Sequence, residues 1–130
     1  MTNSFQITHL DHLVLTVVDV ELTCEFYTRV MGFDIVTYRG GRKALAFENQ
    51  KINLHEIENK FDLTAALPMA GSADLCFLTE TPIDDIIDIA NCGVNLLQGP
   101  THRTGATGPI LSIYFRDPDG NLIEVANKIN

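Results

Sequence analysis

The sequence predicts an α+β fold of two βαβββ modules, which form a curved eight-stranded mixed sheet around a cleft with the helices on its outer face. Three observations predict this fold. The 130 residues contain an internal repeat with a period of about 60 residues. Each half has one segment with helical spacing and several short segments rich in apolar and β-branched residues. Neither half is large enough to bury one face of its own sheet, so the two must pack together or with a partner chain.

The first module is expected to span residues 1–58. Asp19 offers a side-chain oxygen that can cap a helix, and Gly32 can end that helix in the left-handed conformation. Gly40-Gly41 is typical of a hairpin turn. The expected strands around these signals are Leu13–Val18, Phe33–Arg39, Leu45–Glu48 and Ile52–Ile57.

Residues 59–70 show no clear periodicity and are predicted to be a linker, and residues 71–130 repeat the order of the first module. Thr81-Pro82 begins a helix that Gly93 ends, with Ile83, Ile86, Ile87 and Ala90 on one face. Residues 99–108 are predicted to be a loop and residues 117–120 a turn. The expected strands are Asp74–Thr79, Val94–Leu97, Ile110–Arg116 and Leu122–Ala126.

The charge and cysteine content restrict the partners. Nine basic and 17 acidic residues give a formal net charge of −8, which argues against nucleic acid or an anionic membrane as the main partner. The acidity is concentrated in residues 61–130, where nine acids and three bases give −6, against eight acids and six bases, −2, in residues 1–60. Three widely spaced cysteines, no signal peptide and no long apolar run predict a cytoplasmic protein.

Alternation along the strands predicts which side chains face the cleft. Leu13, Leu15 and Val17 form an apolar face suited to pack on the helix, which leaves His12 on the cleft side. The same reasoning places His55, Asp74 and Glu124 on the cleft side of their strands. These four residues are candidate ligands of a divalent ion such as Ni, Zn, Mn, Co or Fe, because imidazole and carboxylate groups suit borderline and hard ions.

Several motifs resemble the vicinal oxygen chelate superfamily, which includes glyoxalases, bleomycin-resistance proteins and extradiol dioxygenases. They are DHLVLTV at 11–17, EFY at 25–27, VMGF at 30–33 and DPDGNLIEV at 117–125. Four further segments resemble the glyoxalase domain-containing protein 5-like group: KINLHE at 51–56, GSADLC at 71–76, RTGATGPI at 103–110 and YFRDPDG at 114–120. The resemblance covers nearly the whole chain.

The resemblance implies roles for individual residues. The first-strand histidine of the family corresponds to His12, and the last-strand glutamate corresponds to Glu124. Asp74 stands where the second module usually carries another histidine. Asn53 stands where the fourth strand often carries Glu or Gln, and His55 follows two residues later on the same face.

The first functional prediction is a metal-dependent lyase or isomerase, similar to lactoylglutathione lyase, that acts on a small oxygenated metabolite or thiol adduct. Glu124 would be its base, with His55 or Asp74 as the opposite group, and Arg103 and Thr104 would bind the substrate. One alternative is a metal-free binding or resistance protein that sequesters a small molecule. A third is an extradiol dioxygenase. The resemblance also implies a homodimer, and leaves open whether one chain or two supply each site.

Overall fold

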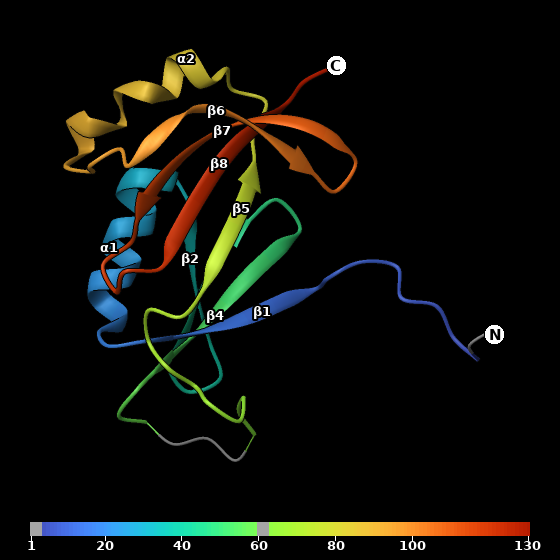
Figure 1. The fold of residues 1–130 in the computed structure, drawn as a ribbon. Helices are drawn as coiled ribbons and strands as arrows, with labels where there is room; N and C mark the ends of the chain where they lie inside the picture. Colours follow the sequence, from blue (N-terminus) through green and yellow to red (C-terminus); the bar gives the residue numbers. More distant parts are fainter. Residues whose placement is uncertain (1–3, 60–62) are drawn as a thin grey trace.

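The predicted α+β fold of two βαβββ modules is confirmed by the computed structural model, which describes residues 4–59 and 63–130 (Figure 1). The eight strands form two separate four-stranded sheets, ordered β1-β4-β3-β2 and β5-β8-β7-β6, and these sheets are not closed around a cleft within one chain. In each sheet one edge strand pairs in parallel with its inner neighbour, β1 with β4 and β5 with β8. The first module contains β1 (His12–Val17), α1 (Val20–Met31), β2 (Asp34–Tyr38), β3 (Arg42–Phe47) and β4 (Gln50–Glu56); the second contains β5 (Asp74–Leu78), α2 (Ile83–Ile86), the 3₁₀ helix η1 (Ile87–Cys92), β6 (Gln98–Gly105), β7 (Gly108–Arg116) and β8 (Leu122–Lys128).

The helix signals of the first module are confirmed. Asp19 Oδ1 accepts a hydrogen bond from Leu22 N at 3.0 Å, so the carboxylate satisfies one of the free N–H groups of the first turn of α1. Gly32 ends the helix with a positive φ of 69°, a conformation that costs glycine little. Gly40 and Gly41 also have positive φ in the turn that joins β2 to β3.

Two predictions in the second module are wrong. Residues 94–97 form no strand, and most of the predicted loop 99–108 is strand β6, which pairs with β7 across a turn at residues 106–107. The strand was missed because β6 lies at the edge of its sheet, where few side chains are buried and the sequence shows no apolar alternation.

The helical segment of the second module is shorter than predicted. Only Ile83–Ile86 is α-helical, and the 3₁₀ helix that follows has a non-helical residue at Asp88. The change of period turns Ile87 toward solvent and buries Ile89 in its place, which corrects the predicted apolar face. Ala90, also predicted on that face, has a side chain outside the described part of the chain.

Both modules bury the same side of their sheets in one core. Leu15 and Val17 of β1 belong to the same apolar cluster as Ile123 and Val125 of β8. Helix α1 lies against both sheets (Figure 1), and the rings of Phe26 in α1 and Phe115 in β7 are 6.3 Å apart. The sheets also meet directly, because the rings of Phe47 in β3 and Phe77 in β5 are 5.5 Å apart.

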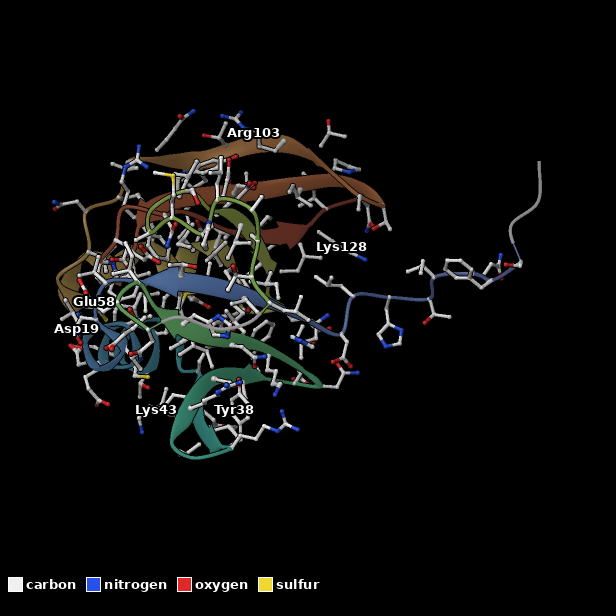
Figure 2. All side chains as sticks on the ribbon, turned by 90° about the horizontal axis from the view of Figure 1, so that it is seen from below. Asp19, Tyr38, Lys43, Glu58, Arg103 and Lys128 are labelled. Atoms are coloured by element: carbon white, nitrogen blue, oxygen red, sulfur yellow. The ribbon has the colours of Figure 1, made fainter. Side chains whose placement is uncertain are left out.

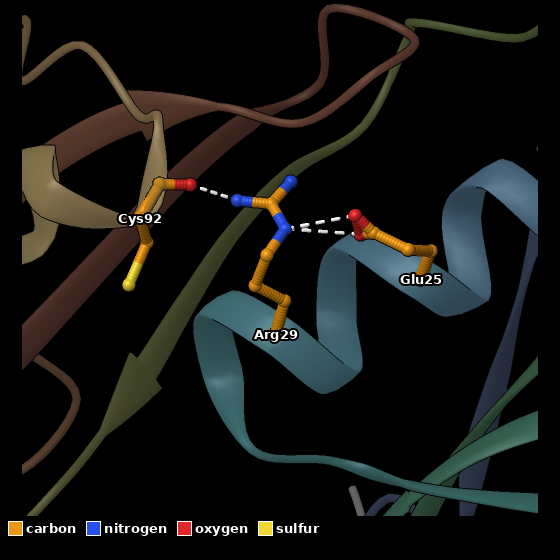
Figure 3. Close-up of polar contacts among 3 residues, drawn as sticks. All are labelled: Glu25, Arg29 and Cys92. Atoms are coloured by element: carbon orange, nitrogen blue, oxygen red, sulfur yellow. Dashed lines mark hydrogen bonds and ion pairs between the residues drawn. The ribbon is translucent and has the colours of Figure 1, made fainter.

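Polar contacts fix the two modules to each other. The buried hydroxyl of Tyr27 in α1 donates to Asp117 Oδ2, at the turn between β7 and β8, over 2.7 Å. Arg29 donates to the carbonyl oxygen of Cys92 in the second module, and Glu25, one turn earlier, holds its Nε at 2.8 Å (Figure 3). The first contact is buried and charged and therefore contributes more than the exposed Arg29–Glu25 pair.

The packing leaves one side of each sheet outside the core. We call these sides the open faces. In the first sheet the open face carries His12, Val14 and Thr16 of β1 with their partners on β4, and in the second it carries Asp74, Cys76 and Glu124 with neighbours on β7. Because the two core sides meet, the open faces point away from each other. No helix of the described residues is long and apolar enough to span a membrane.

We predict that Tyr27→Phe lowers the free energy of unfolding by about 1.5–3 kcal/mol, because it removes a buried hydrogen bond to a charged group. Tyr38→Phe is the matched control. Tyr38 keeps its ring over Lys51, 4.3 Å from Nζ, so this variant should change stability by less than about 0.5 kcal/mol. Urea denaturation at one fixed protein concentration measures both. Equal effects of the two variants would contradict the proposed role of the Tyr27–Asp117 contact.

Candidate metal and ligand site

His12 begins β1 on the open face of the first sheet, as predicted. Its side chain is 44% exposed, and its Nδ1 lies 2.9 Å from Asp11 Oδ2. This hydrogen bond lowers the pKa of Asp11 and orients the imidazole so that Nε2 points away from the pair. A carboxylate behind a histidine is the usual support of a metal-binding imidazole, and Asp11 stands in that position.

The register of β1 and β4 separates His12 from His55. His12 lies opposite Lys51 and His55 lies opposite Thr16, four residues further along the strand. Four residues of parallel strand span about 13 Å, which is too far for both imidazoles to bind one ion. Asn53 lies opposite Val14, only two residues from His12, and is the β4 residue best placed to share a ligand with it.

Asn53 and His55 have different surroundings. The Oδ1 atom of Asn53 is buried and has no hydrogen-bond partner among the described residues. Such an orphaned oxygen is a sign that an ion, a water or a ligand completes the site. His55 lines a separate pocket of about 300 Å³ beneath Leu63–Pro68. Burial, and then the charge of Arg42, lower the pKa of His55.

Glu124 lies on β8 in the middle of the open face of the second sheet. The buried hydroxyl of Ser112 on β7 donates to Glu124 Oε2 at 2.5 Å. Tyr114, also on β7, is the residue directly opposite Glu124. Cys76 pairs with Glu124 from β5, and Asp74 lies two residues before Cys76. The predicted carboxylates Asp74 and Glu124 are therefore close neighbours on one face.

Sequence reasoning missed Ser112 and Tyr114, although a signal was present. The turn at 117–120 is short, and Asp117 O accepts from Gly120 N within it, so the register of β7 against β8 follows from the turn. That register places Tyr114 opposite Glu124.

Gly99 in β6 lies close to the backbone of β7. A Cβ on Gly99 would lie 2.5 Å from the Ser112 carbonyl oxygen, so only glycine allows β6 to approach β7 here.

The two predicted substrate-binding residues lie on opposite sides of β6. Arg103 pairs with Ile110 and donates from Nε to Tyr114 Oη at 3.0 Å, which places it on the open face near Glu124. Thr104 pairs with Pro109 and points to the other side. The structure brings Arg103 to the candidate site and does not bring Thr104 there.

The four predicted metal ligands are divided between the two sheets. His12 and His55 lie on the first, and Asp74 and Glu124 lie on the second. In the part of the chain that the structure describes, no three His, Cys, Asp or Glu side chains gather closely enough to hold a metal ion. In Figure 2, Tyr38, on the first sheet, and Arg103, on the second, lie on opposite sides of the molecule.

Comparison with known proteins identifies the family. A sequence profile described as "Glyoxalase/Bleomycin resistance protein/Dioxygenase superfamily" matches residues 9–125. The chain belongs to this superfamily. It is 54% identical over 124 residues to virulence protein STM3117 of Salmonella typhimurium, covering 95% of this chain and 86% of that protein. The crystal structure of STM3117 superposes with a TM-score of 0.94 at 52% identity, covering 96% of this chain and all of that one.

Other members of the superfamily extend this picture. Glyoxalase domain-containing protein RDO1 of Mycosarcoma maydis is 50% identical over 119 residues, which cover 91% of this chain and 67% of that protein. Three distant structures share the fold alone. The antibiotic-binding protein TnmS3 of Streptomyces is 22% identical, with a TM-score of 0.75 over 96% of this chain and 99% of that one, and lactoylglutathione lyase of Agrobacterium tumefaciens is 20% identical, with a TM-score of 0.71 over 93% and 94%. The fosfomycin resistance protein FosX of Listeria monocytogenes with Mn(II) is 23% identical, with a TM-score of 0.64 over 92% and 90%. The closer relationship to protein 5-like members of the superfamily stays a prediction.

We predict that Cys76 alkylates slowly although it is exposed. Burial of the thiol, and then the nearby carboxylate of Glu124, raise its pKa to about 11. The thiolate fraction at pH 8 is then about 100-fold below that of a thiol with pKa 9. Glu124→Gln removes one cause and should speed reaction with iodoacetamide in EDTA, measured by mass spectrometry with Cys92 as the internal reference. An unchanged rate would show that burial alone is responsible.

Proposed function

We propose that this protein is a homodimeric, metal-dependent lyase or isomerase that acts on a small oxygenated metabolite or thiol adduct. The observation that carries the proposal is that two candidate metal ligands, each held by a hydrogen bond with a neighbouring side chain, lie on open faces that point away from each other. His12 is oriented by Asp11, and Glu124 is oriented by Ser112. One chain cannot bring these faces together, whereas the first sheet of one copy and the second sheet of another can. Each dimer would then hold two sites.

The residues present fit a divalent ion. Asn53 Oδ1 is a buried acceptor without a donor among the described residues, and it lies near His12. Asp74 lies near Glu124 on the second sheet. An imidazole nitrogen with amide and carboxylate oxygens suits Ni, Zn, Mn, Co or Fe, and FosX, which shares this fold, binds Mn(II). His12, Asn53 and Glu124, with Asp74 as a further candidate, would therefore hold the metal.

Exposed apolar side chains on both open faces support a second copy. Val14 is 45% exposed and Val36 is 40% exposed on the first sheet, and Leu78 is 55% exposed on the second. All three lie on edge strands, where a second copy can reach them. Pairing of the two open faces would bury these residues and would form the walls of the cleft that the sequence predicts.

The chemistry follows from the groups around Glu124. A bound divalent ion supplies Lewis acidity, which stabilises negative charge on substrate oxygens. Glu124 would leave the ion, accept the substrate proton on Oε1 and return it, while Ser112 holds Oε2. Asp74 is the nearest second carboxylate. His55 lies too far from His12 to bind the same ion, so its earlier assignment as metal ligand and as the opposite base is not part of this proposal.

We predict that the EDTA-treated wild type binds about one Mn²⁺ per chain, and that His12→Ala and Glu124→Gln each weaken binding at least about 10-fold. Electron paramagnetic resonance of free Mn²⁺ measures this. His102→Ala is the matched control, because His102 is exposed on the other side of β6 and should not matter. Absence of stoichiometric binding of Mn²⁺, Ni²⁺, Zn²⁺, Co²⁺ and Fe²⁺ to the wild type would overturn the proposal.

Mixing the two variants tests whether two chains form each site. After unfolding and refolding together, half of the dimers contain one chain of each kind. If His12 and Glu124 of different chains meet, each mixed dimer regains one intact site, and about a quarter of wild-type Mn²⁺ binding returns. If the residues of one chain meet, no tight binding returns. The second result would remove the dimeric part of the proposal and keep the metal.

A binding protein is the second candidate, favoured by a large pocket that His12 also lines. A hollow of about 980 Å³ lies between the modules, with Phe33, Phe47 and Phe77 in its lining and Asp34 and Asp85 among its carboxylates. Aromatic rings beside carboxylates suit a cationic aromatic ligand. For this function, we predict that the dye ethidium becomes more fluorescent on binding, that Phe77→Ala weakens its affinity, and that Glu124→Gln, outside the lining, leaves it unchanged. Absence of a fluorescence change would remove this candidate.

A further inference from the structure

A row of polar side chains crosses the open face of the second sheet from β6 to β8. Arg103 Nε donates to Tyr114 Oη at 3.0 Å, and the Arg103 guanidinium carbon lies 5.5 Å from the centre of the Tyr114 ring. Tyr114 is the direct cross-strand neighbour of Glu124. Tyr114 therefore lies between a cation and a carboxylate, and burial, then Glu124, raise the pKa of its hydroxyl.

Arg103 retains capacity to bind an anion. Its Nε is bonded to Tyr114 and its Nη1 donates to the His102 carbonyl oxygen at 3.1 Å. Among the described residues, Arg103 forms no ion pair with a carboxylate, and it is exposed. A guanidinium fixed on one edge presents its remaining donors in a planar arrangement that matches an oxyanion.

Glu124 determines which end of a ligand lies at which residue. Its negative charge repels an anionic group, so the anion must lie at Arg103 and a neutral, oxygen-bearing carbon must lie at Glu124. Tyr114 lies between the two residues, hydrogen-bonded to Arg103 and opposite Glu124, which restricts the ligand to a short molecule. Ser112 keeps Glu124 in place through Oε2, so the carboxylate does not rotate toward Arg103 to form an ion pair.

We propose that Arg103 and Tyr114 form an oxyanion-binding subsite beside Glu124, and that Tyr114 is the positioning residue that keeps the guanidinium at the correct distance. The ligand class is a small molecule with a carboxylate or phosphonate one or two bonds from an oxygen-bearing carbon. The inference rests on the proposed function because it takes Glu124 as the group that acts on that carbon. It narrows the substrate to short anions.

Isothermal titration calorimetry of the full-length protein with Mn²⁺ tests the subsite. The probes are glycolate and hydroxymethylphosphonate, with the neutral isostere glycolamide as reference. The wild type should bind at least one of the two acids about 10-fold more tightly than glycolamide. Arg103→Ala and Tyr114→Phe should each remove most of this preference, and Arg103→Lys should restore part of it. Thr104→Val, on the opposite side of β6, should behave as wild type.

The outcomes separate the subsite from the metal. A structural defect in Tyr114→Phe would weaken Mn²⁺ binding as well, whereas loss of the subsite lowers only the preference for acids. If Arg103→Ala and Tyr114→Phe keep the full preference, the inference is overturned while the proposed function stands. If the wild type binds no metal but still prefers acids through Arg103 and Tyr114, the metal proposal fails and the subsite remains. The acid bound more tightly distinguishes a carboxylate from a phosphonate ligand.

Discussion

The shared apolar core between the two sheets determines the direction of the polar side chains in the candidate site. Strand residues alternate between the two sides of a sheet, so burial of Leu15 and Val17 sends His12 outward, and burial of Ile123 and Val125 sends Glu124 outward. Tyr27 ties this core to the turn at Asp117. A shift of one residue in the strand register of either sheet would exchange its core and open faces. The side chains of the candidate site therefore cannot turn inward without loss of the core.

Signals from neighbouring residues made much of the fold predictable. The pairing of strands that are far apart in the sequence could not be predicted in this way. Asp19 and Gly32 act within one turn of α1, and alternation correctly assigned the face of His12. The separation of His12 from His55 depends on the register of two parallel strands joined by a long connection, which no local signal specifies. The edge strand β6 depends on pairing with β7 and lacks apolar alternation of its own.

The surroundings of Glu124 combine local and long-range effects. The tight turn after β7 sets the neighbours of Glu124. Gly99 allows the edge strand β6 to lie close to β7, and Arg103 on that strand reaches Tyr114. Cys76 lies beside the same carboxylate, and its pKa of about 11 keeps the thiol protonated at neutral pH. A protonated thiol is a poor ligand and a poor nucleophile, so oxygen and imidazole groups dominate the chemistry of this face.

The opposed open faces have a consequence for inheritance. In the proposed dimer, each chain gives its first sheet to one site and its second sheet to the other. A chain that lacks both His12 and Glu124 but keeps the core would still pair with a normal copy, and neither site of that pair would be complete. Such an allele would act dominantly over the normal one. An allele that loses the Tyr27–Asp117 contact, and with it the stability of the core, would leave the normal copies to pair with each other and would be recessive.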